Sequence, residues 1–200
     1  MGCVQQIGEQ SVNIGRNAVL ASKLPNSVPG TSVDRQCGSS QQALHFAAQA
    51  VMSGTMDCVI AAGVESMSRI PMTAPGPVAL KAGLGQYMSP QIQKNFGVTE
   101  FTQFLGAEMM AKKYDISRDA MDKYAYQTTL KSIAAINGGH FDNEILSLQA
   151  RIKDMPAGDE MHSIDEGVRF NASLEAISGL NLLQEGGRIT AGTASQICDG

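Results

Sequence analysis

The stretch that decides the fold runs Thr31-Ser-Val-Asp-Arg-Gln-Cys37-Gly-Ser-Ser-Gln-Gln-Ala-Leu-His-Phe-Ala-Ala-Gln-Ala-Val51-Met52. A β-branched run ends near Val33 and passes through a polar turn into Gly38. Apolar residues then recur at helical spacing from residue 39 onward. We therefore predict a strand over 31–36 and a helix over 39–53, with Cys37 on the turn between them.

Cys37 is the first candidate for chemistry. Unpaired backbone N–H groups and the positive end of the helix dipole favour a thiolate at a helix N-terminus, and the thiolate is the nucleophilic form of cysteine. This position predicts an activated nucleophile for acyl transfer. The alternative is a small buried hydrophobe, which is the usual role of a single cysteine in a helix-rich chain. The small residues Gly38, Ser39 and Ser40 favour the catalytic interpretation, because they let a backbone and a substrate approach the sulfur.

A second apolar run, from Asp57 to Ala62 and ending at Gly63, predicts another strand. Strand, helix and strand at this spacing make a βαβ unit with parallel strands and a right-handed crossover. Cys37 then lies at the carboxyl edge of the sheet, where open α/β sheets bind ligands. Residues 65–67 (Glu65, Ser66 and Met67) follow at the same edge, either as walls of a pocket or as a simple exposed loop. A further helix is expected over 15–23.

The segment Val33-Asp-Arg-Gln-Cys37-Gly-Ser-Ser-Gln-Gln-Ala43 resembles the nucleophile motif of the thiolase family, which includes acetyl-CoA acetyltransferases and 3-ketoacyl-CoA thiolases. Other stretches resemble family landmarks in the same order: Gly2–Gln10 with Asn17, Ala62–Ser68, Ala107-Glu108 with Ser117–Asp119, and Thr190–Gly200. The resemblance implies an α/β, thiolase-like fold, made of a partial amino-terminal βαβ sheet domain with an inserted α+β loop domain.

The same resemblance implies three parts along the chain. Residues 1–68 would belong to the amino-terminal domain that carries the nucleophile, 69–188 to a loop domain for coenzyme A and the acyl pocket, and 189–200 to the return. We expect an irregular connection over 69–101, because it is rich in proline, glycine and methionine. Helices are expected near 106–114 and from a Ser117 N-cap to the glycine pair at 138–139. Residues 140–186 alternate strand-like pieces with polar turns and are expected to complete a lid.

Coenzyme A contacts are implied where the family motif matches. Ser195 and Ala194 fall where thiolases hold the pantetheine arm, and Arg169 falls near the arginine that approaches the nucleotide end. An arginine suits that role, because its planar charged fork pairs with phosphate or stacks on adenine. The alternative for Arg169 is an ordinary solvated charge.

Several residues bear on the acyl chain. Thr193 replaces the family's usual asparagine, and Thr102-Gln103 or Gln103-Phe104 stands in place of a usual His-Met pair. Five methionines could line a pliable acyl pocket or simply fill the core: Met67, Met72, Met88, Met109 and Met110.

Thiolase chemistry also needs a histidine to activate the cysteine and a second cysteine as general acid and base. The chain's histidines, His45, His140 and His162, lie in no stretch that resembles the family's histidine motifs. Those motifs belong to the family's carboxy-terminal domain, so we expect these 200 residues to be an incomplete part of a longer enzyme and inactive alone.

The expected reaction is reversible thiolysis or Claisen condensation of 3-ketoacyl-CoA through a cysteine acyl-enzyme, by a homodimer or a dimer of dimers. Two alternatives stay open: a non-catalytic thiolase-like protein that binds acyl-CoA or a partner, and a ketoacyl-synthase-like condensing enzyme.

Composition narrows the class of protein. The chain is 43% hydrophobic and 17% charged, as in ordinary soluble domains, and its net charge of −4 with scattered basic residues argues against nucleic-acid binding. No apolar run approaches the ~20 residues that span a bilayer. The four cysteines are far apart, which argues against zinc and disulfides, and we expect Cys3, Cys58 and Cys198 to be packing residues. We predict a cytoplasmic enzyme with no metal and no tightly bound cofactor, using coenzyme A and acyl-CoA as substrates.

Overall fold

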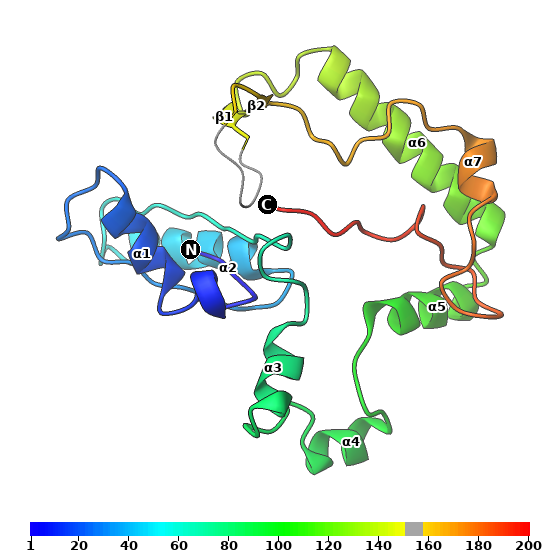
Figure 1. Ribbon diagram of the computed structural model, residues 1–200, viewed down its shortest axis with the longest axis horizontal. Helices are drawn as coiled ribbons and strands as arrows, with labels where there is room; N and C mark the ends of the chain where they lie inside the picture. The colour runs from blue at the N-terminus through cyan, green and yellow to red at the C-terminus, as the bar shows by residue number, and fades with distance from the viewer. Residues whose placement is uncertain (151–157) are drawn as a thin grey trace. The chain divides into compact units, whose positions relative to one another are not determined.

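The computed structural model describes residues 1–150 and 158–200, and the part of the predicted lid over 151–157 lies outside the described residues (Figure 1). The chain forms two units, one of Met1–Glu100 with Ile197–Gly200 and one of Phe101–Gln196. Each unit is described by itself. The domain boundaries inferred from the sequence stay predictions.

The first unit is mainly helical. Its elements are η1 (Gly8–Gln10), α1 (Ile14–Ala21), α2 (Ser39–Met52), α3 (Pro75–Lys81) and α4 (Pro90–Phe96). The predicted helices at 15–23 and 39–53 are confirmed as α1 and α2. The expectation of an irregular connection over 69–101 is wrong, because α3 and α4 lie within it. Each of these helices has a proline in its first turn, where the missing N–H costs nothing, and the Ser89 hydroxyl caps α4.

The two predicted strands are reduced to isolated bridges. Gly2 pairs in parallel with Val33 on one side and with Gly63 on the other, and neither 31–36 nor 57–62 forms a longer strand. The Glu65 carboxylate explains where pairing ends on the Gly63 side. It accepts the backbone N–H groups of Val4 at 2.7 Å and Gln5 at 3.2 Å, so these amides are not available to extend the ladder. The predicted βαβ order is retained as parallel pairing without regular strands.

The first turn of α2 packs directly on backbone. A Cβ added at Gly2 would lie 2.6 Å from Ser40 Cα, and one added at Gly63 would lie 2.8 Å from Ser40 Cβ. Both positions therefore need glycine, because only a residue without a side chain lets the helix approach so closely. The buried residues of α2 are equally small, namely Ser39, Ala43 and Ala47.

The described part of the second unit is also mainly helical. The elements are α5 (Gln103–Lys113), α6 (Arg118–Asn137), β1 (Leu148–Gln149), β2 (Met161–His162) and α7 (Leu174–Ser178), with β1 and β2 antiparallel. The predicted caps of α6 are confirmed: the Ser117 hydroxyl accepts from the Ala120 amide, and the helix ends at Gly138.

Arg118, which is paired with Asp122 within α6, joins α6 to the end of α7. The Arg118 Nε donates to both oxygens of Asp122, at 2.8 and 2.7 Å, and Asp122 is only 2% exposed. The Arg118 Nη2 donates to the carbonyls of Ile177, Ser178 and Leu180. These carbonyls lie at and beyond the helix C-terminus, where intrahelical partners are lacking, so Arg118 caps α7 from outside.

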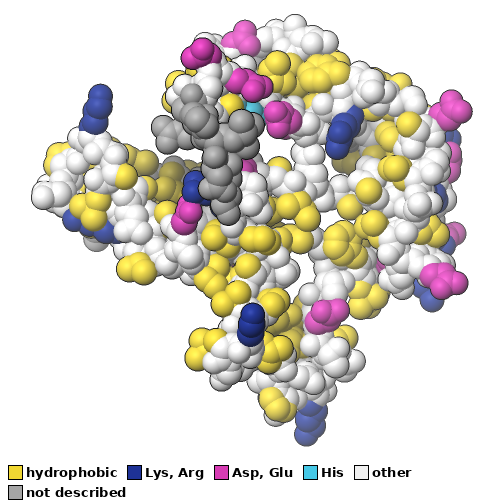
Figure 2. Space-filling view, viewed as in Figure 1, with side chains coloured by type: hydrophobic (Ala, Val, Ile, Leu, Met, Phe, Trp, Pro, Cys, Tyr) yellow, Lys and Arg dark blue, Asp and Glu magenta, His cyan; other side chains and the backbone are white. Residues whose placement is uncertain are grey.

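The exposure of cysteines and methionines corrects the sequence-based expectations. Cys3 is buried as predicted, and burial, with the Glu65 and Asp34 charges, raises the pKa of its thiol. The prediction for Cys58 and Cys198 is wrong: both are exposed, because no element of their unit covers the extended stretches that hold them. Among the methionines, Met88 is buried, whereas Met109 and Met110 are exposed on α5. Figure 2 shows hydrophobic side chains over much of the face in view.

Among the described residues, no helix combines the length and the apolar character needed to cross a membrane. The same residues contain no group of three or more His, Cys, Asp or Glu side chains placed to hold a metal ion.

The packing of α2 on Gly2 predicts that Gly2→Ala in the full-length protein lowers the free energy of unfolding by about 1–3 kcal/mol, since backbone would have to move. Gly76→Ala is the matched control, because a Cβ at Gly76 in α3 meets no described residue within 4 Å. Denaturant unfolding of both variants measures the difference. Equal stability of the two variants would contradict the packing described for α2.

Candidate functional site

Cys37 lies two residues before the start of α2, and its side chain is exposed. The alternative of a buried packing cysteine is therefore wrong for this position. The turn that carries it is closed by the Gly38 amide, which donates to the Arg35 carbonyl at 3.1 Å, and by the Ser39 amide, which donates to the Gln36 carbonyl at 3.0 Å. Gly38 is the N-cap residue of α2, and no side chain of the described residues caps this end. An accessible thiol thus stands at the positive end of a 14-residue helix.

Glu65 has a role that the sequence did not reveal. We expected a pocket wall or an exposed loop, but its carboxylate binds the amides of Val4 and Gln5 and the Gln10 side-chain Nε2, the last at 2.9 Å. The Gln10 side-chain oxygen in turn accepts from the Ser66 amide at 2.7 Å. Glu65 and Gln10 therefore fix the chain that leads away from Gly2 against the chain that leads away from Gly63.

The last residues return to the same edge. The Asp199 carboxylate accepts from the Ser68 amide at 2.8 Å and from the Ser68 hydroxyl at 2.6 Å, and the Gly200 amide donates to the Glu65 carbonyl at 2.8 Å. The two hydrogen bonds from Ser68 hold the pKa of Asp199 below its ordinary value of 3.8. The ionised carboxylate thus ties residues 199–200 to residues 65–68.

The depressed pKa of Asp199 predicts that its hydrogen bonds with Ser68 depend on pH. Because the pKa of Asp199 is lowered in the folded state, its ionised carboxylate stabilises the contact with Ser68 at pH values above the ordinary pKa of an aspartate. That stabilisation is lost as the pH falls through the folded-state pKa. We expect Asp199→Asn to speed hydrogen exchange at the Ser68 amide relative to the unchanged protein at neutral pH, with the ratio approaching one in acid.

The control is Asp57→Asn, which changes an exposed carboxylate in the same unit that makes no hydrogen bond to the described part of the chain. If exchange at the Ser68 amide were equally fast in the unchanged protein and in Asp199→Asn at neutral pH, the tie would be contradicted.

Arg169 belongs to the second unit and is exposed. Its guanidinium makes no hydrogen bond or ion pair with another described residue, so within that part of the chain its donors stay available to a ligand. The structure leaves open both the interpretation as a phosphate-binding arginine and that as a solvated charge.

The turn before Ser195 is built by two threonines. Thr190 is fully buried, and its carbonyl accepts the amides of Thr193 at 3.1 Å and Ala194 at 3.0 Å. The Thr193 hydroxyl accepts from the Thr190 amide at 3.0 Å, which closes the turn on itself. The departure of Thr193 from the family's asparagine therefore has a structural consequence here: its side chain shapes the turn that presents Ala194 and Ser195. Ser195 itself is exposed.

Two features support this turn. The Glu108 carboxylate on α5 accepts the backbone amides of Arg188 and Ile189, at 2.8 and 2.7 Å, just before the turn begins. After the turn, the Gln196 side chain fills the space where Gly167 would carry a Cβ. Because Gly167 and Gln196 are in contact, the chain around Arg169 lies against the chain around Ser195.

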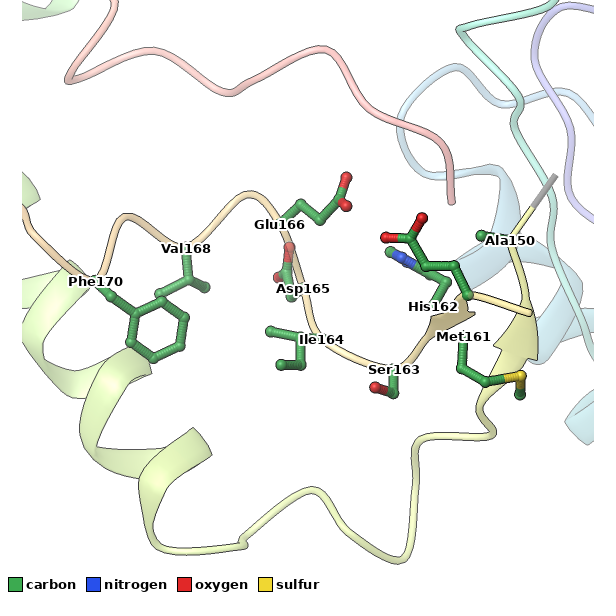
Figure 3. A pocket seen from close by; sticks show the side chains of 10 residues that line it. Ala150, Met161, His162, Ser163, Ile164, Asp165, Glu166, Val168 and Phe170 are labelled. Atoms are coloured by element: carbon green, nitrogen blue, oxygen red, sulfur yellow. The ribbon is translucent and has the colours of Figure 1, made fainter. Parts of the chain in front are cut away.

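One hollow of the second unit does not suit coenzyme A phosphates. It has a volume of about 440 Å³ and lies along the segment 160–170 with Ala150, and Figure 3 shows Asp165, Glu166 and His162 around it. Glu160 also lines it, whereas no Lys or Arg does among the described residues, so its carboxylates would repel an anion.

A smaller hollow of about 260 Å³ is more apolar. Its lining comes from α5 and from the chain before the Thr190 turn: Thr102, Phe104, Leu105, Glu108, Leu183, Gln184 and Ile189. The Glu108 oxygens there are already bonded to backbone, which leaves mainly hydrocarbon surface for a ligand.

Cys37 is thus an exposed cysteine at the start of a helix that packs on parallel-paired glycine backbone, which makes it a candidate nucleophile. The whole chain, residues 1–200, matches the family model described as "Thiolase, N-terminal domain", so the chain belongs to the thiolase family.

Three relatives illustrate the match. The steroid 3-ketoacyl-CoA thiolase FadA6 of Mycobacterium tuberculosis is 44% identical over all of this chain and 47% of its own length, and a 3-ketoacyl-CoA thiolase of Erwinia tasmaniensis is 36% identical over all of this chain and 49% of its own length. The crystal structure of the Bacillus anthracis acetyl-CoA acetyltransferase matches with a TM-score of 0.81 and 27% identity, over 100% of this chain and 50% of that one. The chain therefore has a thiolase-like fold and spans about half the length of the curated relatives it matches.

Proposed function

We propose that this chain is the amino-terminal and loop-domain part of a thiolase-type acyl-CoA acyltransferase, in which Cys37 carries the acyl group. One observation supports this most directly: an exposed cysteine at the N-terminus of α2, in a chain that matches the amino-terminal thiolase domain throughout. The loop domain would be inserted after residue 68, and the chain would return to the amino-terminal domain from residue 189.

The acylation step is a thioester exchange. The Cys37 sulfur attacks the thioester carbonyl carbon of acyl-CoA, a bond forms between them, and the bond from that carbon to the coenzyme A sulfur breaks. The proton leaves the Cys37 thiol and ends on the coenzyme A thiol. A base is needed to carry it, and we assign that base to the carboxy-terminal half of the full-length enzyme.

Coenzyme A would be held by the second unit. The Arg169 guanidinium, without a partner among the described residues, suits the phosphates or adenine of the nucleotide, and Ser195 and Ala194 stand on the Thr190 turn for the pantetheine arm. The contact of Gly167 with Gln196 supports this assignment, because it puts the two stretches beside one another. Coenzyme A and acyl-CoA are substrates in this scheme, with no tightly bound cofactor.

The substrate is proposed to be a 3-ketoacyl-CoA, cleaved by thiolysis or formed by Claisen condensation. The names of the relatives support this class, since they include 3-ketoacyl-CoA thiolases and a steroid 3-ketoacyl-CoA thiolase. The full-length enzyme is proposed to work in the cytoplasm as a homodimer or a dimer of dimers, with residues 31–35 near the partner. Near this stretch, the Gln36 side chain donates to Asp34 and the Gln42 side chain accepts from Arg35, so both have partners within this chain.

The proposal predicts that brief incubation of the full-length protein with acyl-CoA adds one acyl group at Cys37. Mass spectrometry of the digested protein locates the adduct, and Cys37→Ala should carry none. Cys58 and Cys198 serve as internal controls, because they are also exposed thiols but lie away from a helix N-terminus. Acylation of these cysteines or of Cys3 instead, with Cys37→Ala still labelled, would refute the proposal.

For Arg169, we expect Arg169→Ala to raise the KM for coenzyme A in thiolysis about two- to tenfold and to leave kcat nearly unchanged. The modest size follows from the exposure of the side chain, since exposed charge pairs contribute little. Lys131→Ala, on α6, is the matched control for the loss of one positive charge. A KM that is the same in both variants would show that Arg169 is an ordinary solvated charge.

A further inference from the structure

We propose that Ser39 is a positioning residue for Cys37, whose buried hydroxyl holds the turn before the nucleophile in the shape needed for attack. This inference rests on the proposed role of Cys37 and extends it to the groups that orient the sulfur. It starts from a contrast of exposure along the turn: Cys37 is exposed, whereas Ser39, two residues further on, is only 4% exposed.

The hydroxyl of Ser39 acts on residues that precede Cys37. It donates to the Gln36 carbonyl at 2.6 Å and accepts from the Arg35 amide at 2.9 Å. A capping serine would instead accept an amide two or three residues after it in the helix. Ser39 comes after Cys37 in the chain, and both partners of its hydroxyl come before Cys37. The two hydrogen bonds therefore connect the residues on either side of Cys37.

The backbone that it holds is in an uncommon conformation. Gln36, directly before Cys37, has a φ of +49°, in the left-handed region that non-glycine residues rarely adopt. Such a conformation persists only where the surrounding contacts determine it. Ser39 supplies two of these contacts. Asp34 supplies another, since its Oδ1 accepts the Gln36 amide at 2.8 Å.

Packing of α2 also restricts the residues that follow the turn. Ser39 and Ser40 form the part of α2 that packs against Gly2, and Ser40 packs against Gly63 as well. The helix therefore cannot shift to follow a relaxed turn. If the Ser39 hydroxyl is removed, the backbone of Arg35–Cys37 relaxes while α2 stays in place. The Cys37 sulfur then moves relative to a bound thioester. A displacement of about 1 Å at a reacting atom costs up to ~10²-fold in rate.

The experiment measures acylation of Cys37 by acetyl-CoA in the full-length protein, as single-turnover rates over a range of pH. We expect Ser39→Ala to lower the alkaline plateau about ten- to a hundredfold. The apparent pKa from the profile and the Kd for coenzyme A should stay unchanged. Ser53→Ala, at the far end of α2, is the matched control and should behave like the unchanged protein, since within the described residues its hydroxyl bonds only the Ala50 carbonyl and Thr55.

A second pair of variants keeps the test decisive if Ser39→Ala does not fold. Asp34→Asn retains the oxygen that accepts the Gln36 amide and should keep most of the plateau rate, whereas Asp34→Ala should lose it about tenfold. A Ser39→Ala plateau equal to that of the unchanged protein would overturn the inference, and so would equal plateaus in the two Asp34 variants. If the unchanged protein is not acylated at Cys37, the proposed function fails instead, which separates the two results.

Discussion

The direct contact between the first turn of α2 and the backbone at Gly2 and Gly63 is the constraint on which the candidate site depends. A helix that touches backbone leaves no room for side chains between them, so the glycines and the small face of α2 are required together. That contact sets the position of Ser39 and Ser40, and through them the turn that carries Cys37. The Cys37 thiol can be exposed while the residues that support its turn are buried, because the packing lies about one helical turn from the sulfur.

Carboxylates hold extended segments together by hydrogen bonds, as the backbone ladders of long strands do in regular sheets. Glu65 binds two backbone amides beside Gly2, Asp199 binds Ser68, and Glu108 binds two amides before the Thr190 turn. Hydrogen bonds to charged groups contribute about 1.5–3 kcal/mol each when they form, more than neutral ones. Both units therefore use a small number of strong polar ties at the ends of extended segments, which is where the candidate binding residues stand.

The sequence allowed the helices to be predicted where periodicity and caps agree. The helix after Cys37 and the helix from Ser117 to Gly138 follow from their patterns. The strands were overpredicted, because an apolar run shows a preference for extended backbone and does not show which amides side chains will take. In 31–36, for example, the Arg35 and Gln36 amides donate to the Ser39 and Asp34 side chains. The helices α3 and α4 were missed because Pro75 and Pro90 suggested interruption, whereas a proline in the first turn also begins helices. Exposure of Cys58 and Cys198 could not be predicted, since it depends on which elements cover them.

Part of the candidate site could likewise be predicted from the sequence, and part could not. The turn at Cys37 was predictable from local sequence, whereas the assignment of Arg169, Ala194 and Ser195 to coenzyme A stays a prediction. The partners of the Ser39 hydroxyl and of Glu65 were not predictable, because these contacts exist only once the chain is folded.

The central claim is that Cys37 forms a covalent acyl-enzyme before the second substrate reacts. Quenched-flow measurement of coenzyme A release from acyl-CoA by the full-length protein tests this most directly. The account predicts a rapid burst of one coenzyme A per chain that disappears in Cys37→Ala, and a linear release without a burst, unchanged by that substitution, would contradict it.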